Sequence, residues 1–152
     1  MNLRIDGRLF MTTAGDFIAI SLAVAAAGCT SSGPAETTGF GAAPLMTVHS
    51  QSKQLTIDVR SSPQPPVRGT NDVELTVTDS TDGGPVDGLA IGVKPWMPTM
   101  GHGTSIVPTI VPEMNGKYLV SGVDLYMPGL WQLRLTISGP MQDNAAPAFE
   151  IQ

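Results

Sequence analysis

The chain has 152 residues and a formal net charge of −5, from 8 Lys+Arg against 13 Asp+Glu. A surface that neutralises phosphates needs a basic excess or cluster, so this balance argues against nucleic acid as a partner. Gly and Pro are abundant (17 and 13 residues), which disfavours long helices. The length favours one folded domain. A single cysteine, Cys29, excludes an internal disulfide framework and a multi-cysteine zinc site.

The first 28 residues have the pattern of an export signal. Arg4 and Arg8 precede an apolar run at residues 17–28, FIAISLAVAAAG. A transmembrane helix needs about 20 residues, whereas this shorter run has the length of the hydrophobic region of a signal peptide. It ends in Ala26-Ala27-Gly28-Cys29, which resembles the lipobox of bacterial lipoproteins, in which the cysteine becomes the lipidated first residue. An ordinary secretory signal with an incidental cysteine is the alternative.

Either signal predicts that the mature chain lies outside the cytoplasm, on the periplasmic side of the cell envelope. Residues 29–45 are rich in Gly, Ser, Thr, Ala and Pro, and we expect them to form a flexible tether. The tether would join a lipid on Cys29, and hence the membrane, to a domain at residues 46–152. Thr30 replaces the Asp that often retains lipoproteins at the inner membrane, which weakly favours the outer membrane.

The remaining residues read as short strands separated by turns. In Asn71–Asp79 the apolar residues Val73, Leu75 and Val77 alternate with polar ones, which is the pattern of a half-buried antiparallel strand. Similar segments are expected at Leu55–Arg60, Leu89–Lys94, Ser105–Val111, Lys117–Leu125, Leu130–Ser138 and Ala148–Gln152. About seven short strands without a helical period predict an all-β, antiparallel β-sandwich. Pro108 and Pro112 predict that the strand expected at Ser105–Val111 lies at the edge of a sheet.

The candidate chemistry lies in PWMPTMGHG, residues 95–103. Met97, Met100 and His102 place two thioethers and one imidazole within six residues. Thioethers are soft ligands that select Cu(I), and imidazole also binds copper. Met127 stands in a similar segment, and neighbouring strands could bring it to the same place. All three methionines lie in Pro- and Gly-rich segments, which we interpret as turns. The spacing predicts an exposed Met/His copper site.

Simpler interpretations of these residues stay open. Methionine also fills irregular gaps in cores, and a histidine in a loop is often only solvated. Trp131 is predicted to be a core residue, whereas Trp96 either covers the metal or packs as a buried aromatic. Tyr118 is expected to pack with its hydroxyl at the surface. His49 and Met114 are interpreted as surface residues outside the site.

Three segments together resemble the YtkA-like domain, which is related to the FixH family. They are Met97-Pro98-Thr99-Met100-Gly101-His102, then Gly116-Lys117-Tyr118, then Met127-Pro128-Gly129-Leu130-Trp131, and the resemblance covers roughly residues 50–138. It implies an extracytoplasmic, immunoglobulin-like sandwich. Members commonly occur as lipoproteins or membrane-anchored proteins. Many look associated with copper handling or oxidase assembly.

Two functions of different classes remain open. One is a lipid-anchored copper-binding or copper-delivery protein, whose partner is an envelope protein or copper acceptor. The other is a metal-free structural or interaction module tethered to the envelope. An enzyme is not expected, because neither of the two histidines stands in a nucleophile motif and no phosphate-binding loop follows a strand. No small-molecule substrate is evident.

Overall fold

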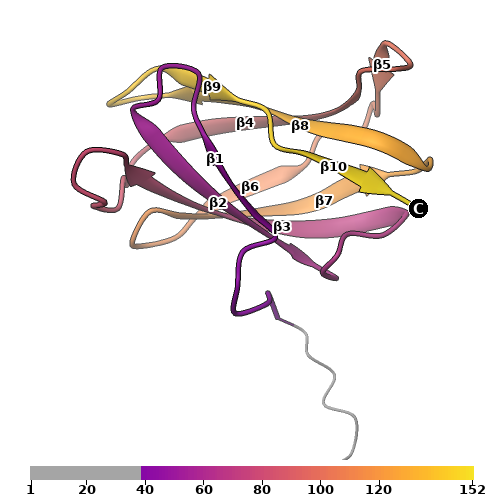
Figure 1. Cartoon of the computed structure of the whole chain (residues 1–152), viewed down its shortest axis with the longest axis horizontal. Helices are drawn as coiled ribbons and strands as arrows, with labels where there is room; N and C mark the ends of the chain where they lie inside the picture. The colour runs from indigo at the N-terminus through magenta and orange to yellow at the C-terminus, as the bar shows by residue number, and fades with distance from the viewer. Residues whose placement is uncertain (1–38) are drawn as a thin grey trace, which may run out of the picture. The chain divides into compact units, whose positions relative to one another are not determined.

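The computed structural model describes residues 39–152 as an all-β domain of ten strands. The predicted signal at residues 1–28 and Cys29 lie outside the described residues. Two antiparallel sheets lie one above the other (Figure 1). Sheet A has the order β1 (Met46–His49), β2 (Leu55–Ser62), β3 (Gly69–Asp79), β7 (Lys117–Leu125), β6 (Thr109–Pro112). Sheet B has the order β10 (Ala148–Ile151), β8 (Gly129–Ser138), β4 (Ala90–Met97), β5 (His102–Gly103), and β9 (Asp143–Ala145) also pairs with β8.

The predicted alternation of apolar and polar residues builds the core between the sheets. Along β2, Leu55, Ile57 and Val59 are fully buried while the residues between them are half-buried. Sheet B contributes inward residues such as Trp131 and Leu133, also with no exposed surface. Because each sheet has one apolar face, packing the two faces together removes both from water. The predicted β-sandwich is therefore confirmed.

The agreement of the strand boundaries differs from strand to strand. The predicted Lys117–Leu125 coincides with β7. The predicted Ser105–Val111 is wrong at its start, because β6 begins at Thr109, but its edge position in sheet A is confirmed. Strands β1, β5 and β9 were not predicted. They have four, two and three residues, too few for a periodic pattern to be recognised. None of the segments in residues 39–152 forms a helix with the length and apolar character needed to span a bilayer.

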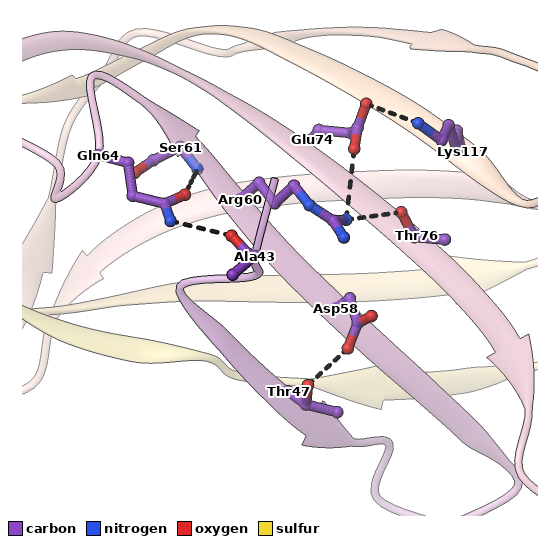
Figure 2. A network of polar contacts seen from close by, with 9 residues as sticks. All are labelled: Ala43, Thr47, Asp58, Arg60, Ser61, Gln64, Glu74, Thr76 and Lys117. Atoms are coloured by element: carbon purple, nitrogen blue, oxygen red, sulfur yellow. Dashed lines mark hydrogen bonds and ion pairs between the residues drawn. The ribbon is translucent and has the colours of Figure 1, made fainter. Parts of the chain in front are cut away.

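Residues 39–45, at the end of the predicted tether, make contacts with sheet A. The N–H of Leu45 donates to the carbonyl oxygen of Val59 at 2.7 Å. The side-chain amide of Gln64 donates to the carbonyl oxygen of Ala43 at 3.0 Å (Figure 2). Phe40 to Ala42 line a depression together with side chains of the outer face of this sheet. The chain therefore enters the domain on the side of sheet A.

An ionic network lies on the same outer face. Glu74, on β3, accepts from Arg60 at 3.4 Å and from Lys117 at 3.2 Å (Figure 2). Arg60 also donates to the hydroxyl of Thr76 at 3.3 Å. The Glu74 side chain is only 11% exposed, so two cations compensate its desolvation. The network ties the outer face of β2, β3 and β7 together.

Candidate metal centre

The hairpin β4–β5 brings the first two candidate ligands together. Met97 ends β4 and His102 begins β5, and the two residues are direct partners in the antiparallel register. The N–H groups of Met100 and Gly101 both donate to the carbonyl oxygen of Met97, at 3.2 and 3.0 Å, and close the turn. Gly101 has a φ of 68°, which suits glycine. Direct antiparallel partners point to the same face with Cβ atoms about 5 Å apart, so Met97 and His102 share the core-facing side.

Met97 does not lie in a turn, and that interpretation is wrong. It is a core residue with 3% of its surface exposed. The inward alternation of β4 continues through Ile91, Val93 and Pro95 to Met97, all of which are buried. The prolines on either side of Trp96 suggested a loop, whereas the strand extends past the first of them. The thioether of Met97 is therefore at the inner end of the candidate site.

The connection from β7 to β8 carries Met127 to the same end of the sandwich. Met127 is half-buried and packs against the core. Its carbonyl oxygen accepts from Nε1 of Trp131 at 2.9 Å. Two residues further on, Gly129 has a φ of 123°, and a Cβ at this glycine would lie 3.0 Å from Cε of Met97. The Met127 segment and the end of β4 are thus in close contact.

Tyr126 holds the imidazole of His102. The Tyr126 hydroxyl lies 3.1 Å from Nδ1 of His102, and the two rings are stacked, with centroids 6.4 Å apart. The edge of Tyr126 also packs on Trp131, at 5.5 Å between centroids. Its carbonyl oxygen accepts from Nε of Arg68 at 2.9 Å. Contacts on several sides fix Tyr126, and its hydroxyl engages Nδ1, so a metal ion would have to bind the imidazole through Nε2.

The exposure of the four candidate ligands rises from the core outwards. Met97 is buried, His102 and Met127 are half-buried, and Met100 is 57% exposed. Within residues 39–152, no group of three or more His, Cys, Asp or Glu side chains is placed to hold a metal ion. A site formed by Met97, Met100, His102 and Met127 would use thioether sulfur, a ligand that suits a soft ion.

His49 and Met114 lie away from this end, as expected. His49 is exposed, and its Nδ1 is 3.3 Å from the hydroxyl of Thr56. His49 lies beside the C-terminal end of β3. Tyr126 lies beside the N-terminal end of β3, at the opposite end of the sandwich. His49 and His102 therefore cannot share a metal ion. Met114 is 80% exposed in the turn between β6 and β7.

The aromatic expectations have mixed outcomes. Trp131 has no exposed surface and is confirmed as a core residue. Trp96 is half-buried on the outer face of sheet B, opposite in direction to Met97, so it neither covers the candidate site nor lies in the core. The surface position predicted for the Tyr118 hydroxyl is wrong. This hydroxyl donates to the carbonyl oxygen of Val86 at 2.9 Å and accepts from the N–H of Leu89 at 3.1 Å, where it is buried.

Sequence reasoning missed Tyr126 and Gly129 as parts of the site. Both are adjacent or nearly adjacent to Met127 in the chain, and this proximity was the available signal. The role of the Tyr126 hydroxyl is recognisable only from its contact with His102, and that of Gly129 only from its contact with Met97.

These features define a small two-sheet β-sandwich protein with methionines and one histidine gathered at one end. The family model described as YtkA-like matches residues 49–136, and the chain belongs to this family. No curated protein matches the sequence. A crystal structure of a DUF4426 family protein from Pseudomonas aeruginosa PAO1 is similar, with 11% identity and a TM-score of 0.46, over 69% of this chain and 93% of that one. At this level the similarity supports no inference.

Proposed function

We propose that this YtkA-like protein is a lipid-anchored, extracytoplasmic domain that binds Cu(I) through Met97, Met100, His102 and Met127. It would serve copper handling or oxidase assembly. One observation carries the proposal: His102 is the direct partner of Met97 across β4 and β5, while the Tyr126 hydroxyl engages Nδ1 of the imidazole.

The donor set suits a soft, monovalent ion. Thioether sulfur carries no charge and prefers Cu(I) to hard ions such as Mg²⁺ or Ca²⁺. A histidine that ligates a metal through one ring nitrogen commonly donates its other N–H to an oxygen, which fixes the tautomer and the ring orientation. The Tyr126 hydroxyl is placed to accept that N–H. The residues present therefore fit copper.

The gradient of exposure supports exchange of the ion rather than permanent storage. Met100 stands at the tip of the hairpin with more than half of its surface in solvent, and Met97 lies beneath it in the core. A copper ion would reach the buried thioether by way of the exposed one. A copper acceptor could approach the same tip.

The location rests on sequence features. The apolar run before Cys29 and the residues that precede this cysteine support export and lipidation. Several acyl chains would anchor the protein far more firmly than one. The first strand, β1, begins at Met46, so a short segment would join it to a lipid on Cys29 and keep the domain close to the membrane.

The test is a competitive Cu(I) titration under reducing conditions. The full chain carries Cys29→Ser, so that its thiol cannot take up copper. We expect one Cu(I) per chain, and an affinity that falls about tenfold or more in Met97→Leu, Met100→Leu and His102→Gln. Leucine is chosen because it keeps the apolar volume at the buried Met97. Met114→Leu and His49→Gln are the matched controls, and their affinity should not change.

The alternative, a metal-free interaction module, is favoured by exposed apolar residues between β5 and β6. Ile106 is 53% exposed and Val107 is 82% exposed. Apolar residues at such positions are common in contacts between proteins. If the Cys29→Ser chain takes up no Cu(I), and the same substitutions change only its stability, this alternative replaces the copper site.

A further inference from the structure

The outer face of sheet B carries two basic residues in an unfavourable arrangement. Lys94 on β4 and Arg134 on β8 are direct partners in the antiparallel register, and both are exposed. Like charges placed directly opposite each other destabilise a sheet. This pair occurs in a chain whose net charge is −5. The local charge is therefore opposite in sign to that of the whole chain.

Trp96 holds the two cations in place. The Arg134 guanidinium lies 4.2 Å from the centroid of the Trp96 ring, and the Lys94 ammonium lies 5.2 Å from it. A guanidinium stacked on an aromatic face still directs its N–H groups outwards. The aromatic ring thus offsets part of the repulsion and orders the donors before any partner arrives.

Among the described residues, neither cation forms an ion pair with an acidic side chain. Glu150 lies on the same face, opposite Leu130 at the β10 edge. Leu130 is four residues before Arg134 along β8, which is about 13 Å in a strand. The repulsion between Lys94 and Arg134 therefore lacks an internal counter-charge.

We infer that Lys94, Arg134 and Trp96 form a docking surface for a protein partner that presents carboxylates. Charge complementarity identifies the partner, because carboxylates placed between the two cations would remove their repulsion. The surface also adjoins the candidate metal centre. Trp96 precedes Met97 on β4, so a protein docked here would sit beside the tip of the β4–β5 hairpin.

An anionic bilayer offers the same charge, and the position of residues 39–45 argues against it. These residues lie against sheet A, so the chain enters the domain on the side opposite to Trp96. With a lipid on Cys29, sheet A would face the membrane more readily than sheet B. The choice of a protein over a bilayer rests on the lipid anchor of the proposed function. The assignment of a basic docking surface does not depend on that anchor.

The test uses a polyglutamate peptide and the full chain in mild detergent, with no copper present. Trp131 is fully buried, so the fluorescence of the half-buried Trp96 reports binding at this face. We expect saturable binding that weakens with salt, and about tenfold weaker binding by the double variant Lys94→Gln/Arg134→Gln. Lys53→Gln, an exposed lysine in the loop after β1, is the control and should bind like the unmodified chain.

Two outcomes would overturn the inference. One is the absence of saturable peptide binding, or equal binding by the double variant. The other is that the chain binds phosphatidylglycerol vesicles through Lys94 and Arg134 but does not bind the peptide. This result would assign the face to the membrane. Because copper is absent from these measurements, their failure is distinct from failure of the Cu(I) titration.

Discussion

Tyr126 and His102 meet at 3.1 Å between the phenol oxygen and Nδ1 of the imidazole, with the two rings stacked. Tyr126 lies in the connection from β7 of sheet A to β8 of sheet B, whereas His102 begins β5 of sheet B. The contact therefore ties the β7–β8 connection to the β4–β5 hairpin at the end where the methionines gather. It also determines which nitrogen of His102 is available.

The Tyr126→Phe variant should bind Cu(I) about tenfold more weakly, because an outer-shell hydrogen bond to a ligating histidine typically contributes that much to metal affinity. The free energy of unfolding should fall by only about 1 kcal/mol, since one half-buried hydrogen bond is lost. A competitive Cu(I) titration and urea unfolding measure the two effects.

Tyr118→Phe is the matched control for that variant. It removes a buried hydroxyl that holds Val86 and Leu89, and it leaves the N–H of Leu89 without its partner. We expect a loss of stability of about 1–3 kcal/mol and an unchanged Cu(I) affinity. If the two variants alter copper affinity equally, Tyr126 has no special role at the site.

Gly129→Ala should destabilise the protein more than Gly69→Ala. Both glycines have a positive φ, 123° and 105°, so each substitution strains the backbone by about 1–3 kcal/mol. A Cβ at Gly69 meets nothing within 4 Å, whereas one at Gly129 meets Cε of Met97 at 3.0 Å. The difference between the two unfolding free energies, expected to be about 1 kcal/mol, measures the crowding against Met97. If both variants lose the same free energy of unfolding, the Met97 side chain can move away from the new Cβ without destabilising the protein.

Asp143 should make stability depend on acid pH. Although burial raises its pKa, hydrogen bonds from Ser50 and Ser52 and from the N–H groups of Asn144 and Ser52 lower it from 3.8 to about 2. Because folding lowers this pKa, the ionised carboxylate stabilises the fold above pH 3.8, and the contribution disappears as the pH falls through about 2. After screening by solvent, we expect a contribution of up to about 2 kcal/mol.

Denaturant unfolding of the unmodified chain and Asp143→Asn across this pH range checks the expectation. The two proteins should differ above pH 3.8 and converge towards pH 2. A difference that stays constant down to the acid limit would mean that the carboxylate charge is not the cause.

The sandwich was predictable from the sequence because alternation is regular in the long strands. β2 is the clearest case, since the buried Leu55, Ile57 and Val59 alternate with half-buried polar residues. β9 could not be recognised, because its buried Asp143 is satisfied by hydrogen bonds from Ser52, a residue distant in the chain. A strand that buries a polar residue lacks the apolar alternation by which strands are recognised in a sequence.

The candidate site was only partly predictable. The spacing of Met97, Met100 and His102 indicated a cluster, and the structure places Met97 and His102 opposite each other. The burial of Met97 was missed, because two nearby prolines hid the continuation of β4. The role of Tyr126 depends on the approach of the β7–β8 connection to the β4–β5 hairpin, which no local pattern contains.

The central claim is that methionine sulfur and the His102 imidazole hold Cu(I), and copper X-ray absorption of the loaded Cys29→Ser chain tests it most directly. Sulfur and nitrogen scatterers should both surround the metal, and Met97→Leu should reduce the sulfur contribution while Met114→Leu leaves it unchanged. A chain that retains no Cu(I), or a metal surrounded by nitrogen and oxygen alone, would contradict the account.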